Sequence, residues 1–366
     1  PLTEQPGATI TITGTNFDPV ALNNIVTFGA TTGTVTNASL TSLDVEVPIG
    51  ATYNYIRVLN TSTGLTAIST VPFMPIFSPS KSGISTNDLE ARVDFASSSP
   101  TKMKISELDG DGKADLIAIN PNSNLVSVYR NTSSTGIINA GSFDAAINLT
   151  TGNAPYGVAV GDVDGDGKPD IVVPNENDTT ISVYHNTSTS GTISFAARVN
   201  FATNSVRPVG VVIGDIDGDG KPDLAVTCIL FSMNVFRNTS TVGVIDNASF
   251  ASAVSFGGGN ASEHIAIGDI DGDGKPDLIK SNLNGGNVLV FRNTSTVGTI
   301  TFDGGVSFAT GLSPTTVEVG DLDGDGKLDM AVSVAGTHRV SVFHNTATPY
   351  VIAARIVVAS QRKFLS

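Results

Sequence analysis

Five short acidic segments are the residues in this sequence whose types and spacing could do chemistry. Four follow the pattern D-x-D-G-D-G-K-x-D, as in "DVDGDGKPD" at 162–170, and the first differs only in having Glu107 in the leading place. Four carboxylates this close together repel one another unless a cation neutralises them. An all-oxygen ligand set suits calcium better than the smaller, strictly octahedral magnesium. The spacing therefore predicts five metal loops, each binding one calcium ion.

The predicted ligands of each loop are its four acidic side chains and the carbonyl of its lysine, whose side chain we expect to point to solvent. Glycines at the fourth and sixth places, such as Gly165 and Gly167, let the backbone turn through positive φ. The predicted metal ligands are Glu107, Asp109, Asp111, Lys113 and Asp115; Asp162, Asp164, Asp166, Lys168 and Asp170; Asp215, Asp217, Asp219, Lys221 and Asp223; Asp269, Asp271, Asp273, Lys275 and Asp277; Asp321, Asp323, Asp325, Lys327 and Asp329.

The net charge of the chain comes from these loops. Each loop carries four acids and one lysine, so five loops at −3 contribute −15 to a chain total of −14. The rest of the chain is therefore close to neutral. Because there is no basic stripe to meet phosphates, nucleic acid is excluded as an expected partner.

The segments that flank the loops are short β-branched runs, such as "YGVAV" before and "DIVVPN" after the second loop. An EF-hand would need a helix on each side, so we expect each loop to join two strands of a β-hairpin. The leading acids are 55, 53, 54 and 52 residues apart. An "NTS" turn, "NTA" in the last repeat, follows each loop, and an "FxxxVxF" segment follows the second, third and fourth loops in phase. Four strands repeating about every fifty residues predict a β-propeller with one blade per repeat.

These repeats resemble FG-GAP (VCBS-type) repeats, the propeller blades that also occur in integrin alpha subunits. The resemblance covers about residues 85–347, through loop, turn and last strand together. It implies a secreted or cell-surface protein that binds proteins or glycans, with calcium mainly stabilising the blades.

The N-terminal part has short alternating strands without an acidic loop, which predicts a small β-sandwich. Through "ITGTNF" and "VPIGA" it resembles an immunoglobulin-like IPT/TIG domain. Too little chain precedes these strands for such a domain, so the sequence looks trimmed from something longer. The predicted organisation is an all-β chain with a sandwich at 1–74, a linker at 75–84, a calcium-binding propeller at 85–350 and a tail at 351–366.

Closure of the propeller has two solutions from the sequence. Residues 90–97 read as a last strand without its blade, so they could complete the fifth blade and leave no exposed edge. Residues 351–360 read as a competing last strand on the outside of that blade. A seven-bladed ring that is truncated here is the alternative to five blades.

The predicted function is non-catalytic recognition of a glycan or an extracellular protein, by a monomer. The four histidines are scattered, and no nucleophile motif accompanies them; His185 and His344 stand where other repeats have Arg, which indicates residues at a strand edge. The alternative is the accessory or catalytic propeller of a polysaccharide-degrading lyase or hydrolase. Loops on the face opposite the acidic segments vary between repeats, and specificity is usually located in such loops. The contact candidates there are Phe231, Met233, Arg207, His264, His338 and Arg339.

Further expectations concern location and modification. No apolar run is long enough to cross a bilayer, and loops that fill at millimolar calcium indicate an extracellular or cell-surface location, for which we expect a bacterial source. Cys228 is expected to be a buried apolar residue. Sequons at Asn131, Asn186, Asn238 and Asn293 could carry glycans, but their identical placement favours hydrogen-bonded turns.

Overall fold

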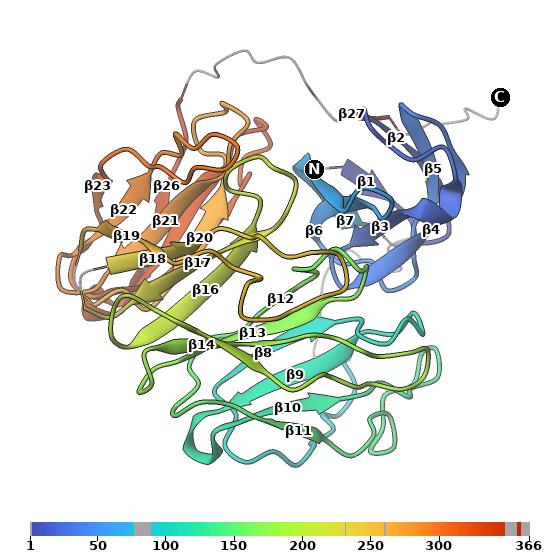
Figure 1. Ribbon diagram of the computed structural model, residues 1–366, viewed down its shortest axis with the longest axis horizontal. Helices are drawn as coiled ribbons and strands as arrows, with labels where there is room; N and C mark the ends of the chain where they lie inside the picture. Colours follow the sequence, from blue (N-terminus) through green and yellow to red (C-terminus); the bar gives the residue numbers. More distant parts are fainter. Residues whose placement is uncertain (1, 77–88, 231, 260, 348–356, 360–366) are drawn as a thin grey trace.

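The fold is all-β, as predicted. A computed structural model describes residues 2–76, 89–230, 232–259, 261–347 and 357–359. Within these residues the chain forms 27 β-strands and three short 3₁₀ helices, η1 (Ala21–Asn23), η2 (Pro121–Ser123) and η3 (Ala335–Thr337). No helix among them is long and apolar enough to span a membrane. Figure 1 shows an N-terminal sheet beside a series of smaller sheets.

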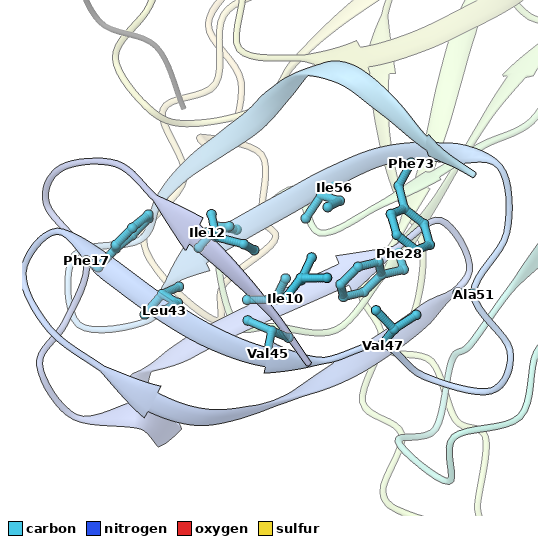
Figure 2. Packing of buried hydrophobic residues seen from close by; sticks show 12 residues of the cluster. Ile10, Ile12, Phe17, Phe28, Leu43, Val45, Val47, Ala51, Ile56 and Phe73 are labelled. Atoms are coloured by element: carbon cyan, nitrogen blue, oxygen red, sulfur yellow. The ribbon is translucent and has the colours of Figure 1, made fainter. Parts of the chain in front are cut away.

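The N-terminal sheet is a sandwich or barrel with one core. Its strands pair in the order β1-β7-β6-β3-β4-β5-β2-β27. In the core, shown in Figure 2, the rings of Phe28 and Phe73 meet edge to face with centroids 5.1 Å apart. The resemblance to an IPT/TIG domain stays a prediction. The strands are β1 (Leu2–Glu4), β2 (Thr9–Thr13), β3 (Asn24–Phe28), β4 (Thr31–Ala38), β5 (Ser42–Glu46), β6 (Asn54–Asn60), β7 (Leu65–Pro75) and β27 (Val357–Ala359).

Five antiparallel sheets follow, four of them four-stranded, which fits propeller blades. The first comprises β8 (Lys102–Ser106), β9 (Asp115–Asn120), β10 (Leu125–Tyr129) and β11 (Ile147–Thr150). The second comprises β12 (Ala159–Gly161), β13 (Asp170–Asn175), β14 (Thr180–Tyr184) and β15 (Val199–Ala202). The third comprises β16 (Pro208–Gly214), β17 (Asp223–Cys228), β18 (Ser232–Phe236) and β19 (Val254–Gly257). The fourth comprises β20 (Ile265–Gly268), β21 (Asp277–Asn282), β22 (Asn287–Phe291) and β23 (Val306–Ala309), and the fifth β24 (Pro314–Gly320), β25 (Asp329–Val334) and β26 (Arg339–Phe343).

The hydrophobic cores lie between consecutive blades. Side chains alternate between the two faces of a strand, and where one blade follows another, the two faces turned toward each other are covered. Ile181 and Val183 of β14, for example, pack with Leu224 and Val226 of β17 in the next blade. The first strands also contact one another in series, from β8 through β12, β16 and β20 to β24. Each blade is therefore stabilised mainly by its neighbours, and buried Cys228 fits this pattern as expected.

The predicted closure of the ring by residues 90–97 is wrong within the described residues. The described fifth blade has three strands, and residues 90–97 form no strand on it. They lie against the first blade instead, where Tyr129 Oη donates to the carbonyl of Ala96 at 2.7 Å and Phe95 contacts Phe143. A preceding blade would place its last strand there, because Tyr184 donates to Thr150 of the first blade in the same way.

The fifth blade consequently keeps an open face. Val340 and Val342 are 71% and 59% exposed, whereas the equivalent Val288 and Val290 of the fourth blade are 0% and 8% exposed. Of the competing strand at 351–360, only β27 is described, and it pairs with β2 rather than with a blade. The rest of the predicted tail and most of the predicted linker, 77–84, lie outside the described residues.

Candidate metal centres

Each acidic segment joins the first two strands of its blade and is organised around its leading carboxylate. In the second loop, Asp162 Oδ1 accepts from the N–H of Gly165 at 2.7 Å and Oδ2 accepts from Gly167 at 2.9 Å. These glycines have φ of +75° and +89°, which only glycine adopts without strain. The alternating acids and glycines thus form the loop locally, before any contact with the rest of the blade.

The last acid of each loop connects it to the NTS turn of the same blade. Asp170 Oδ2 accepts from the N–H of Val163 at 3.0 Å, and its Oδ1 accepts from the N–H of Asn186 at 2.8 Å. Both oxygens therefore already accept backbone hydrogen bonds. The same pair of bonds recurs at Asp115, Asp223, Asp277 and Asp329.

The carboxylates converge closely enough to share a cation. In each of the first three loops, three acids bring one oxygen each to within 4.8 Å of the others, namely Glu107, Asp109 and Asp115; Asp162, Asp164 and Asp166; and Asp215, Asp217 and Asp223. Burial, and to a smaller extent the neighbouring carboxylates, raise the pKa of Asp115, Asp164 and Asp223 to about 7. These groups resist ionisation without a counter-charge, so the loops fit a hard divalent cation with oxygen ligands. That the lysine carbonyl is a further ligand stays a prediction.

The pKa shifts predict an unusual pH dependence for the metal-free protein. The pKa of Asp115, Asp164 and Asp223 is raised to about 7, against 3.8 ordinarily. A raised folded-state pKa contributes stability that is complete below the unfolded pKa and lost as the pH rises through the folded one. In EDTA, we expect the melting temperature to fall from about pH 5 to about pH 8. Differential scanning fluorimetry would check this, and a melting temperature that rises over the same interval would contradict it.

A basic residue from the third strand of each blade also reaches the acidic loop, which the sequence did not predict. Arg130 donates from Nε to Asp109 and from Nη2 to Asp111, both at 2.6 Å. Arg292 holds the fourth loop in the same way. The available signal was position, because these residues directly precede the NTS asparagine. The others are Arg237, 4.0 Å from Asp219, and His185 and His344 near Asp164 and Asp323.

The expectation that loop lysines point to solvent is wrong for two loops. Nζ of Lys221 and of Lys275 donates to the carbonyl of Ser240 and of Ser295, each at 2.7 Å. The long side chain bends back because the NTS turn of its own blade presents an acceptor within its reach. In these two loops the lysine side chain therefore links the acidic loop to the NTS turn.

The NTS asparagines join successive blades. Asn238 is fully buried, and its Nδ2 donates to Pro222 O of its own loop at 2.7 Å and to Val163 O of the previous blade's loop at 2.6 Å. Asn186, Asn293 and Asn345 make the corresponding pair of bonds. An Nδ2 atom that donates both of its hydrogens to buried carbonyls is not accessible for attachment of a glycan. At these positions the structure therefore supports the hydrogen-bonded turn.

The N-terminal sheet covers the first three loops. The carbonyl of Ala30 accepts from the N–H of Glu107 at 2.8 Å, and the N–H of Thr66 donates to Gly220 O at 3.0 Å. A side chain at Gly167 would collide with Ile25 of the N-terminal sheet. Burial of the third-position acid follows this cover, since Asp109, Asp164 and Asp217 are buried while Asp271 is half-buried and Asp323 exposed.

Charged and aromatic side chains from all five blades also meet one another in or beside the inner strands. Nζ of Lys102 lies 4.2 Å above the ring of Tyr156, and Arg207 Nε donates to Glu176 at 3.0 Å. Burial lowers the pKa of Lys102, and the charge of Glu263 opposes this shift. We call this set the axial cluster; its members are Lys102, Tyr156, Glu176, Arg207, Glu263, His264 and Glu318.

The predicted contact residues lie in different environments. Arg207 and His264 belong to the axial cluster, with His264 Nε2 3.7 Å from Glu318 Oε1. Met233 is wrong as a contact, because it is fully buried between the third and fourth blades. His338 and Arg339 are exposed at the start of β26, and Phe231 lies outside the described residues.

Fold and site together define a protein of repeated β-blades whose hairpins carry acidic loops that could hold a metal ion. The repeat itself is identified by a family model, the FG-GAP-like repeat, which matches residues 108–173, 162–226 and 281–332. The chain thus contains three FG-GAP-like repeats, as the resemblance predicted. No curated protein matches the chain.

Several solved structures are similar to the chain at low identity. A lectin from Agrocybe aegerita that recognises non-reducing terminal N-acetylglucosamine is 18% identical, with a TM-score of 0.45 over 92% of this chain and 94% of that one. A functionally unknown protein from Desulfotomaculum acetoxidans is 14% identical, with a TM-score of 0.46 over 80% and 81%. A biofilm matrix protein of V. cholerae is 17% identical, with a TM-score of 0.39 over 67% and 37%. All three scores are below 0.5, so these likenesses say nothing about function.

Proposed function

We propose that the chain is a calcium-stabilised, non-catalytic recognition module that binds a glycan or an extracellular protein through the axial cluster. The observation that carries this proposal is that one cluster receives polar side chains from five blades. An aromatic ring beside paired charges is the combination that binds hydroxyl-rich or polar ligands, through stacking and directed hydrogen bonds.

The division of the two faces supports this assignment. The acidic loops repeat nearly the same residues in every blade, and the first three are covered by the N-terminal sheet. The axial cluster, by contrast, receives a different combination of side chains from each blade, namely Lys102, Tyr156 with Glu176, Arg207, Glu263 with His264, and Glu318. Function on a repeated scaffold resides in such variable positions. We infer an extracellular location, because loops of modest affinity fill where calcium is millimolar.

The backbone of Arg207 adopts a left-handed conformation. Its φ is +59°, which is strained for a residue with a side chain. Ala154, Ala261 and Ser313 have the same left-handed conformation at the equivalent place in other blades. The left-handed conformation therefore belongs to the corner of every such blade and does not mark a binding site. What distinguishes Arg207 is its charged side chain.

A glycan array probed with the full chain in calcium tests the proposal. We expect specific signal, and we expect Arg207→Ala to weaken it about tenfold or more, because the variant removes a charged contact and leaves Glu176 unpaired. Arg92→Ala is the matched control, since Arg92 is an exposed arginine outside the axial cluster. A signal that Arg207→Ala leaves intact would place binding elsewhere, and release of reducing or unsaturated sugar ends would favour the polysaccharide-degrading alternative.

A further inference from the structure

The second acidic loop differs from the others in the group that faces its third acid. In the first and fourth loops this group is an arginine, which donates to Asp109 or Asp271. In the second loop it is His185, whose Nδ1 lies 2.9 Å from Asp164 Oδ2 and 3.6 Å from Asp170 Oδ1. Both carboxylates are fully buried, and the imidazole is 17% exposed.

The two closest atoms, His185 Nδ1 and Asp164 Oδ2, do not form a hydrogen bond with each other. Among the described residues, His185 Nδ1 and Asp164 Oδ2 are both buried without a hydrogen-bond partner, because their contact lacks hydrogen-bond geometry. Asp164 as a whole is only 3% exposed. Buried polar atoms in native proteins are almost always partnered, so two unpartnered ones side by side indicate a partner that both atoms could share.

A metal ion has the right dimensions for that partner. Zinc binds imidazole nitrogen and carboxylate oxygen at about 2.0–2.2 Å, so two ligands of one ion lie roughly 3–3.5 Å apart. The separations of 2.9 and 3.6 Å in the second loop are close to this range. One ligand atom each of Asp164, Asp170 and His185 lie within 4.8 Å of one another. Imidazole is a ligand for zinc, cobalt, nickel and copper, whereas calcium takes oxygen ligands.

We propose that Asp164, Asp170 and His185 form a site for a divalent transition metal of the zinc class. This goes beyond the proposed recognition function and does not depend on it. Asp164 also belongs to the predicted calcium set of the second loop, so the two ions compete there. The other four loops keep their preference for calcium.

The fifth loop provides an internal comparison. His344 Nε2 lies 3.0 Å from Asp323 Oδ2 and 3.9 Å from Asp325 Oδ2, but the three side chains are 57%, 48% and 33% exposed. At this exposure, solvent water can satisfy these atoms without an ion. We therefore expect the fifth loop to bind a transition metal much more weakly than the second.

Cobalt(II) titration of the full chain tests the site. The protein is stripped with EDTA, supplied with excess calcium and titrated with cobalt, and the visible absorption of the ion reports nitrogen and carboxylate coordination. We expect one saturable set of bands that zinc abolishes. His185→Arg, which introduces the residue of the first and fourth loops, is expected to eliminate the bands, while His344→Arg retains them.

A second variant and a second readout keep the test decisive. His185→Gln removes the imidazole with little change in volume and is expected to weaken zinc binding by about 10–100-fold. Zinc added in excess calcium should raise the melting temperature of the unsubstituted chain but not of His185→Gln. Cobalt bands unchanged by both variants, or an absence of bands from calcium-responsive protein, would overturn the proposal. Because the calcium response is recorded on the same samples, such a failure is distinct from a failure of the metal loops in general.

Discussion

Removal of calcium is expected to lower the melting temperature of the chain by about 10 °C or more. Calcium binds only the folded loops, so each occupied site stabilises the folded state, by about 2.7 kcal/mol at a hundredfold excess over its dissociation constant. Without the ion, carboxylates such as Asp164 and Asp223 are buried with their pKa raised to about 7. Scanning calorimetry with calcium and with EDTA measures the difference.

Stoichiometry and reversal control this experiment. Returning calcium should restore the melting temperature, and magnesium should restore less of it because it tolerates fewer and more rigidly placed ligands. Isothermal calorimetry on stripped protein should find about five ions, one per loop. One ion or none, or a melting temperature that ignores EDTA, would reject calcium as the stabilising ion.

Replacement of a blade-joining asparagine is expected to have the second-largest effect. Asn238→Ala removes the donor that joins Val163 O of one loop to Pro222 O of the next, and the acceptor of the N–H of Ser240. The carbonyls of Val163 and Pro222 and the N–H of Ser240 then stay buried without this hydrogen-bond partner, which costs about 2–4 kcal/mol. The melting temperature should fall by roughly 5–10 °C.

Asn131→Ala is the matched control for this substitution. Asn131 occupies the same place in the first blade, but no acidic loop precedes it in the sequence, and within the described part of the chain its Nδ2 donates to Ala114 O alone. Its replacement should cost about half as much. Equal effects of Asn131→Ala and Asn238→Ala, measured in the same calcium buffer, would show that the bond between blades contributes nothing.

Much of the fold was predictable because its signals are local. The acid and glycine spacing of "DVDGDGKPD" forms the loop through hydrogen bonds within a few residues, such as Gly165 N–H to Asp162. The period-two runs on either side form strands for the same reason. Repetition of both signals about every fifty residues then indicated four-stranded blades, with one blade for each repeat.

The parts that could not be predicted depend on distant contacts. Position alone does not show that Arg130 turns toward Asp109, or that Met233 faces the next blade and not solvent. Closure failed for a similar reason. Residues 90–97 do have the pattern of a last strand, but a pattern does not say which blade they lie beside, and Ala96 contacts the first.

The uneven cover of the acidic loops also has a kinetic consequence. An ion in the first three loops is overlaid by the N-terminal sheet through contacts such as Thr66 to Gly220, whereas the fifth loop opens to solvent. If calcium binds as proposed, an ion at the open end of the blade series should exchange quickly with solvent, whereas an ion beneath the N-terminal sheet should leave only after that sheet detaches. The same acidic sequence, repeated five times, would then give fast-exchanging and slow-exchanging sites in one chain.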